Sequence, residues 1–200
     1  MKYLKGLAII ALMLVATSVL QPNLARAAST TIISATPLDP WGNPNTLAYR
    51  GHPAGVNLTL NSDGGNTSVR VFITLIDRDN VAVGAVSTSA VVSGQTSLTL
   101  NFSVASYAFV GTGRYIITVT DTNLKPIATL TVPVNISILG DFNFSGRVDF
   151  QDILNFVDAF CYYNQHHEIP SSNKKFDING DQKIDFNDML IFSAAFADFN

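Results

Sequence analysis

Roughly the last third of this 200-residue chain repeats itself, and the repeat constrains the fold more than any other feature of the sequence. When the sequence is aligned with itself at an offset of 36, positions 141–160 fall on positions 177–196, and nine of the 20 pairs are identical. The identical pairs are Asp141/Asp177, Asn143/Asn179, Asp149/Asp185, Phe150/Phe186, Asp152/Asp188, Leu154/Leu190, Phe156/Phe192, Ala159/Ala195 and Phe160/Phe196. Self-similarity at a fixed offset indicates a duplicated structural unit.

Each repeat begins with oxygen-bearing side chains at alternate positions, a spacing that suits calcium. Ca²⁺ is a hard cation that takes oxygen ligands from loop positions 1, 3, 5, 7, 9 and 12, the seventh through its backbone carbonyl. The sequence therefore predicts two calcium sites, in which the basic residue at position 7 contributes only its carbonyl oxygen. The predicted ligands are Asp141, Asn143, Ser145, Arg147, Asp149 and Asp152 in the first loop, and Asp177, Asn179, Asp181, Lys183, Asp185 and Asp188 in the second.

Each predicted loop runs into a helix with an apolar stripe, at positions 153, 156 or 157, and 160 in one repeat and 189, 192 and 196 in the other. The apolar residue at position 8, Val148 or Ile184, is expected to let the two loops pair through a short strand. The alternative is a pair of Asp- and Asn-rich turns that only cap helices. Two such turns in phase, each followed by its helix, favour the calcium interpretation.

The sixth loop position needs a sharp turn and therefore favours glycine. The first loop has Gly146 there and the second has Gln182, which predicts about 1 kcal/mol of backbone strain in the second loop. The second loop offsets this with four carboxylates against three, since calcium affinity rises with ligand charge. Both loops are expected to bind calcium, and the order of their affinities stays open.

The two loop-helix repeats resemble the dockerin family. Like that family, they have aspartate at position 12, where an EF-hand has glutamate, and they lack the helix that enters the loop of an EF-hand. The resemblance covers residues 139–200 and includes the start Gly140-Asp141-x-Asn143. It implies a small two-helix module that is stabilised by calcium and docks a cohesin domain. Such docking usually assembles polysaccharide-degrading enzymes on a scaffold or cell surface.

The resemblance also implies that positions 10 and 11 of each loop select the partner. These positions hold Phe150 and Gln151 in the first repeat, and Phe186 and Asn187 in the second. Family members often carry smaller polar or aliphatic residues there, so the phenylalanines depart from the pattern. They form either a symmetric apolar contact surface or part of a shared core. Core packing is the preferred interpretation, with Gln151 and Asn187 exposed.

The first 27 residues read as a secretory signal. They combine a basic start at Lys2 and Lys5, an apolar run at 7–20 and the small-residue pattern Ala25-Arg26-Ala27. A retained anchor is the alternative, but the run of about 14 residues is shorter than the roughly 20 that a membrane span needs. We therefore expect a secreted protein, extracellular or at the cell surface, with no membrane span after cleavage.

Residues 28–139 predict an all-β, immunoglobulin-like sandwich. Segments rich in Val, Ile and Thr lie at 69–77, 81–92, 96–104, 114–121 and 127–138, and turn residues such as those at 93–94 separate them. Stretches near 31–35 and 55–60 complete about seven strands. The stretch 113–119, Gly-Arg-Tyr-Ile-Ile-Thr-Val, resembles the penultimate strand of adhesion-type modules in secreted prokaryotic proteins. This likeness concerns the fold and carries no function.

The sandwich segment offers no paired acid and base, so an enzyme is not expected. Trp41 reads as a core or edge plug, in preference to an exposed ring that stacks on carbohydrate. The pattern Asn-x-Ser/Thr makes glycosylation a further expectation, although a glycan on Asn143 would crowd the first calcium loop. The pattern occurs at Asn57, Asn66, Asn101, Asn135 and Asn143.

The predicted organisation is a signal at 1–27, a β-sandwich at 28–139 and a small α-helical dockerin-like module with two calcium loop-helix repeats at 140–200. The acidic balance, with net charge −3, leaves no basic surface for nucleic acid. The sequence favours a non-catalytic, calcium-dependent assembly protein with a cohesin-type partner. The alternative is a structural cell-surface or filament subunit whose sandwich polymerises or joins a surface layer, while calcium only stabilises the tail. A surface polysaccharide is a further candidate partner.

Overall fold

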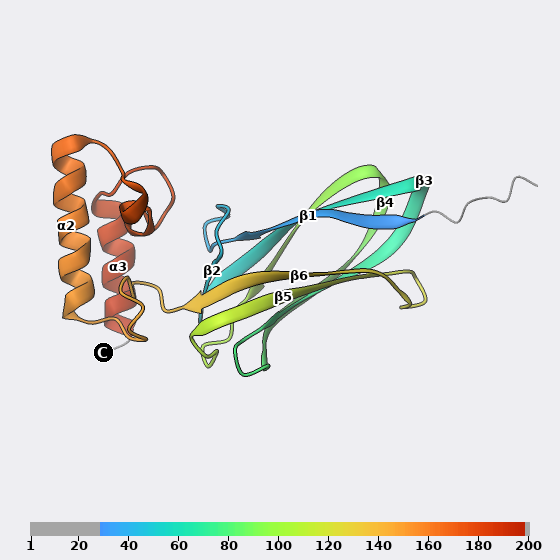
Figure 1. Cartoon of the computed structure of the whole chain (residues 1–200), viewed down its shortest axis with the longest axis horizontal. Helices are drawn as coiled ribbons and strands as arrows, with labels where there is room; N and C mark the ends of the chain where they lie inside the picture. Colours follow the sequence, from blue (N-terminus) through green and yellow to red (C-terminus); the bar gives the residue numbers. More distant parts are fainter. Residues whose placement is uncertain (1–28, 199–200) are drawn as a thin grey trace, which may run out of the picture.

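The computed structural model describes residues 29–198, so the expected signal at 1–27 lies outside the described residues. Strands gather at one end of the molecule, and two helices lie side by side at the other (Figure 1). None of the described helices has the length and apolar character needed to cross a membrane. The elements are β1 (Thr30–Leu38), β2 (Leu47–Tyr49), β3 (Pro53–Ile76), β4 (Ala82–Ser103), β5 (Gly111–Thr120), β6 (Pro126–Ser137), α2 (Phe150–His166), the 3-10 helix η1 (Ser171–Phe176) and α3 (Phe186–Asp198).

The six strands form one sheet that folds over on itself as a sandwich. Its order is β1-β3-β5-β6-β2, and β4 pairs with the other edge of β3. The first half of β3 pairs with β1 and its second half with β5, so β3 belongs to both layers. Strand β1, at one end of this order, lies beside β6, the strand before the other end, so the two layers face each other (Figure 1). The predicted all-β sandwich is confirmed at this level.

Strands β3 and β4 are longer than the sequence predicts. The turn residues at 93–94 were expected to separate two strands, but β4 runs through them. The register shifts between Ser62 and Thr67 of β3, opposite this point of β4. Gly65 and Gly94 adopt left-handed φ angles of 83° and 58°, which glycine reaches without steric strain. These residues therefore bend the strand pair and leave it continuous.

Alternate side chains of the long strands fill the core of the sandwich, as the two-residue period of a strand requires. The fully buried set includes Val56, Leu58, Leu60, Val71, Ile73, Leu75, Tyr115, Ile117 and Val119.

A second core lies between the helices of the tail and is built largely from phenylalanine. The ring of Phe142 lies 4.6 Å from that of Phe176 and 5.2 Å from that of Phe192, measured between centroids. Val148 and Ile184, at position 8 of the two loops, are also buried in this core. The expected strand pair between the loops is wrong, because no β-bridge joins them within residues 29–198. Packing against the phenylalanines, not pairing, holds the two loops together.

The turn that follows β3 depends on a buried carboxylate. Asp77 Oδ1 accepts the N–H groups of Asp79 and Val81, both at 3.0 Å, and Oδ2 accepts that of Phe109 at 3.2 Å. Burial raises the pKa of this carboxyl, but the N–H donors outweigh it, so the pKa of Asp77 lies below its ordinary value. Asp77 thus ties the β3–β4 turn to the loop that precedes β5.

We predict that Asp77→Ala lowers the free energy of unfolding of the sandwich by about 2 kcal/mol, because three backbone N–H groups lose their acceptor. Urea unfolding at neutral pH measures the change. Since the pKa of Asp77 is lowered by folding, its contribution is present above the unfolded pKa and is lost as the pH falls below it. The difference in free energy of unfolding between the wild type and the variant should therefore become smaller in acid.

Asp79→Ala is the matched control for this prediction. Its exposed carboxylate lies 3.8 Å from Arg78 in a surface ion pair, so the expected change is within about 0.5 kcal/mol. Equal losses for the two variants would show that Asp77 has no special role.

Candidate metal centre

An aspartate at position 12 closes the first loop. Asp152 Oδ1 accepts the N–H groups of Phe142 and Asn143 at 2.9 and 3.1 Å, and Oδ2 accepts that of Asp149 at 2.9 Å. In the second loop, Asp188 accepts the backbone N–H groups of the three equivalent residues, each 36 positions further along the chain, at 2.7, 3.1 and 2.9 Å. Both carboxylates have no exposed surface. The duplication seen in the sequence is therefore a duplication of hydrogen bonds as well.

The aspartates at positions 9 and 12 also start the helix after each loop. Asp149 is the N-cap of α2 and forms a capping box with Asp152. Its Oδ1 accepts the N–H of Gln151 at 2.9 Å, and Asp185 Oδ1 accepts that of Asn187 at 2.7 Å before α3. Such caps satisfy N–H groups that have no partner within the helix. These residues therefore serve helix capping whether or not a cation is bound.

Position 1 distinguishes the loops from plain capping turns. Asp141 accepts the N–H groups of Ser145 and Gly146 at 2.9 and 2.8 Å, one on each oxygen. Asp177 accepts the N–H of Gln182 on Oδ2 at 3.0 Å, while its buried Oδ1 has no hydrogen-bond partner. A buried acceptor without a partner is costly. The second loop thus has an oxygen that a cation would satisfy.

The carboxylates of each loop lie close enough to disfavour one another's charge. Burial raises the pKa of Asp141, and the Asp152 carboxylate raises it further. Burial likewise raises the pKa of Asp177, with a contribution from Asp188 and a smaller one from Asp181. The pKa of Asp188 is also raised, first by burial. Like charges held together in a partly buried loop favour a bound cation.

The remaining oxygen donors of the first loop lie near one another. Asn143 Oδ1 accepts the N–H of Ser145 at 2.8 Å, and Ser145 Oγ donates to the carbonyl of Arg147 at 3.1 Å. Asp149 is turned toward the Arg147 guanidinium, with Oδ2 at 2.9 Å from Nε. Within residues 29–198, no group of three or more His, Cys, Asp or Glu side chains is placed to hold a metal ion, and this includes the aspartates of the two predicted calcium loops. Amide, hydroxyl and carbonyl oxygens are the hard donors that calcium accepts, so this donor set fits calcium better than a transition metal.

The second loop repeats only part of this arrangement. Asn179 Oδ1 accepts the N–H of Asp181 at 2.9 Å, and Asn179 Nδ2 lies 3.3 Å from Asp181 Oδ2. The N–H of Lys183 donates to Asp181 Oδ1 at 3.0 Å. Positions 3 and 5 are thus brought together.

Each loop has two left-handed residues, and only one of them could be foreseen. Position 6 is left-handed in both loops, with φ of 89° at Gly146 and 66° at Gln182, as the sharp turn required. Position 4 is also left-handed, with φ of 57° at Phe144 and 74° at Gly180. Each loop therefore combines one glycine with one strained residue. Gly180 is the residue in the sequence that could have predicted the left-handed backbone at position 4.

We predict that Gln182→Gly stabilises the tail by about 1 kcal/mol, because a left-handed backbone strains a residue that has a Cβ atom. Thermal unfolding in calcium measures this change. The same substitution at Gln151, in the first turn of α2, should destabilise by a similar amount because glycine weakens a helix. If both variants lost stability, position 182 would not be strained.

The two phenylalanines at position 10 lie on the surface, so the preferred interpretation of core packing is wrong. Phe150 is 67% exposed and Phe186 is 62% exposed. One helical turn further on, Leu154 and Leu190 are 42% and 52% exposed. Each helix buries its other face against the phenylalanine core, which leaves the first residue of the helix outside. We call this exposed pair of residues on each helix the repeated apolar patch.

Other predicted positions divide between surface and core. Gln151 and Asn187 are exposed, as expected. Val157 and Met189, predicted for the apolar stripes, are 43% and 45% exposed. Trp41 is half-buried and packs against the core of the tail, which agrees with the plug interpretation.

A comparison with protein-family models and with curated protein sequences finds no match. Among solved structures, a β-galactosidase from Bacteroides fragilis is 13% identical over 52% of this chain and 17% of its own, with a TM-score of 0.42. A Niemann-Pick type C2 protein from the Japanese carpenter ant is 9% identical over 55% of this chain and 93% of its own, with a TM-score of 0.39. A CARDB domain from Pyrococcus furiosus is 14% identical over 56% and 93%, with a TM-score of 0.35. The chain spans less than a fifth of the β-galactosidase, and likenesses at this level carry no functional argument.

Proposed function

We propose that this chain is a non-catalytic, secreted calcium-binding protein whose dockerin-like tail mediates protein–protein assembly. The observation that carries the proposal is the correspondence between the two loops, each of which has a closing aspartate, a position-1 carboxylate and an exposed phenylalanine 36 residues from its counterpart. A turn that only capped a helix would need neither the carboxylate at position 1 nor the exposed phenylalanine ring.

Calcium would be held by oxygen atoms at the alternating loop positions. In each loop the first carboxylate would lose the penalty that burial and its acidic neighbours impose. In the second loop Asp177 Oδ1 would gain a partner. The ligands would be Asp141, Asn143, Ser145, the Arg147 carbonyl, Asp149 and Asp152 in one site, and Asp177, Asn179, Asp181, the Lys183 carbonyl, Asp185 and Asp188 in the other.

The repeated apolar patch, with Gln151 and Asn187 beside it, is the proposed contact surface for a cohesin-type domain. Exposed aromatic side chains at corresponding places on two helices suit a partner that can engage either repeat. A link to polysaccharide degradation, glycosylation and an extracellular or cell-surface location belong to the same proposal.

The alternative, a self-assembling structural subunit, would use a strand such as 30–36 to join the next copy. In this chain β1 already pairs with β3, from Thr30 opposite Ser62 to Leu38 opposite Gly55. That pairing favours the assembly-module proposal, and self-assembly is kept as an outcome of the test below.

We predict two calcium sites in titration calorimetry of the full chain, and a tail that unfolds at a higher temperature in calcium than in chelator. Asp141→Ala should remove the first site and Asp177→Ala the second, because each variant lacks the carboxylate at position 1. Magnesium at the same concentration is the control ion. The absence of calcium heat, together with unchanged unfolding in chelator, would refute calcium binding.

We further predict that calcium-loaded protein captures a discrete cohesin-type partner from the secreted fraction of its host, and that chelator releases it. Phe150→Ser and Phe186→Ser should each retain capture through the other repeat, whereas the double variant should lose it. Val91→Ser, which alters another exposed apolar side chain, on the sandwich, is the matched control. Recovery of copies of the same chain alone would support the self-assembling subunit.

A further inference from the structure

A residue of the sandwich reaches into the second loop of the tail. Asn43 lies in the turn that leads to β2, and its Nδ2 donates to the backbone carbonyl of Asn179, at position 3 of the loop, at 3.3 Å. Gly180 follows with a φ of 74°, and a Cβ atom placed there would collide with the Asn43 side chain. The two segments, 136 residues apart in the sequence, therefore approach as closely as a glycine allows.

Asn43 is held in place before it meets the loop. Asp39 is only 8% exposed, and its Oδ1 accepts the N–H groups of Trp41 at 3.0 Å and of Asn43 at 2.9 Å. Its Oδ2 lies 3.5 Å from Asn43 Nδ2. The backbone N–H of Asp39 in turn donates to the carbonyl of Asn43 at 2.9 Å. This network fixes the turn, so its contact with Asn179 costs little additional ordering.

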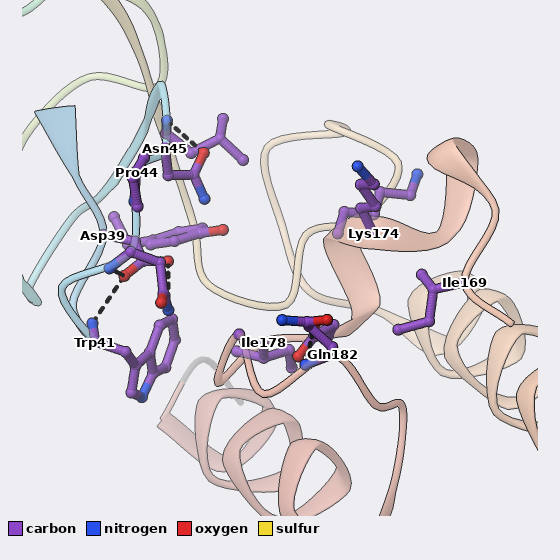
Figure 2. Close-up of a pocket in the computed structure, with 14 residues that line it drawn as sticks. Asp39, Trp41, Pro44, Asn45, Ile169, Lys174, Ile178 and Gln182 are labelled. Atoms are coloured by element: carbon purple, nitrogen blue, oxygen red, sulfur yellow. Dashed lines mark hydrogen bonds between the residues drawn. The ribbon is translucent and has the colours of Figure 1, made fainter. Parts of the chain in front are cut away.

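Apolar packing surrounds the same contact. Trp41 and Tyr49 pack against the tail core, which includes Ile178 at position 2 of the second loop. Figure 2 shows Trp41 and Ile178 near one another at the edge of a cavity, with Lys174 across it. The cavity measures about 670 Å³, and Asp177 also contributes to its lining. The sandwich thus contacts the second loop beside its position-1 carboxylate.

The first loop meets the sandwich differently. A cleft of about 730 Å³ is lined both by Gly146 of that loop and by residues of the loop before β5, Phe109 and Val110 among them. Tyr49 of the sandwich also lines a small space together with Asp141 and Phe144 of the first loop. The sandwich therefore contacts both loops, and the hydrogen bond from Asn43 belongs to its contact with the second.

We infer that Asn43 is a positioning residue for the second loop, through which the sandwich raises the calcium affinity of that loop. This inference rests on the calcium function proposed above. By thermodynamic reciprocity, calcium in the second loop strengthens the docking of the tail on the sandwich by the same factor. The molecule then becomes a stiffer unit when calcium is bound, and its tail is presented in a fixed direction.

Calcium titration of the full-length Asn43→Ala variant tests the inference. One hydrogen bond of this kind contributes about 0.5–1.5 kcal/mol, which converts to a loss of affinity of about 2- to 13-fold at the second site. The first site should change less than about 2-fold, because sites without shared partners behave independently. The backbone N–H of residue 43 still reaches Asp39 in this variant, so the turn should persist. Asn123→Ala, in the exposed turn between β5 and β6 at the far end of the sandwich, is the matched control.

Trp41 provides a second readout, because it is the single tryptophan of the chain and packs on the tail. Its emission should change as the second site fills. In Asn43→Ala, higher calcium should be needed for the same change, and Asn123→Ala should follow the wild type.

A double-mutant cycle with Gly180→Ala separates direct contact from a general loss of stability. Alone, Gly180→Ala strains the left-handed backbone and collides with Asn43. In the Asn43→Ala background only the backbone strain remains, so the further loss of affinity should be smaller. Additive losses would show that the two residues do not communicate.

Two negative results have different meanings. Two calcium sites with wild-type affinities in Asn43→Ala would overturn the positioning role and leave the calcium function standing. Absence of calcium binding in the wild type would refute the proposed function and, with it, this inference.

Discussion

The structure of the tail depends on the burial of one carboxylate in each loop. Asp152 and Asp188 have no exposed surface, and each accepts three backbone N–H groups. Burying a carboxylate is costly unless it is fully hydrogen-bonded, and these donors come from both ends of the loop. Closing the loop in this way puts the side chain at position 2, Phe142 or Ile178, into the core between the helices. Loop closure, helix start and core formation are therefore one event in each repeat.

Because both loops close in this way, each local feature of the tail occurs twice. Two acidic loops hold their position-1 carboxylates in partly buried surroundings, and two helices begin with an exposed phenylalanine. The pairs differ in detail. The first loop has its glycine at position 6 and strain at Phe144, whereas the second has its glycine at position 4 and strain at Gln182. Gly180 has a second consequence, since it makes room for the side chain of Asn43.

The sandwich does not only carry the tail but also contacts it, through β2 and the turn that precedes β2. The short strand β2 pairs with the end of β6, just before the chain enters the first loop. The turn that precedes β2 carries Trp41 and Asn43, and the buried carboxylate of Asp39 shapes that turn. Buried aspartates thus organise the turn at Asp77, the turn at Asp39 and both repeated loops. Five of the 14 aspartates of the chain are buried in these turns and loops, whereas glutamate occurs once, at Glu168.

The features that depend on local spacing could be predicted from the amino-acid sequence. The offset of 36 located both loops, glycine at position 6 predicted a sharp turn, and segments rich in Val, Ile and Thr predicted strands. Which side chains are covered depends on how the folded elements pack, and spacing does not predict it. The start of α2 and α3 places Phe150 and Phe186 outside the core, and the paired bend at Gly65 and Gly94 joins segments that read as separate strands. The contact of Asn43 with Asn179 spans 136 residues. Spacing along the chain is a local property, whereas burial and docking depend on elements that meet only after the whole chain has folded.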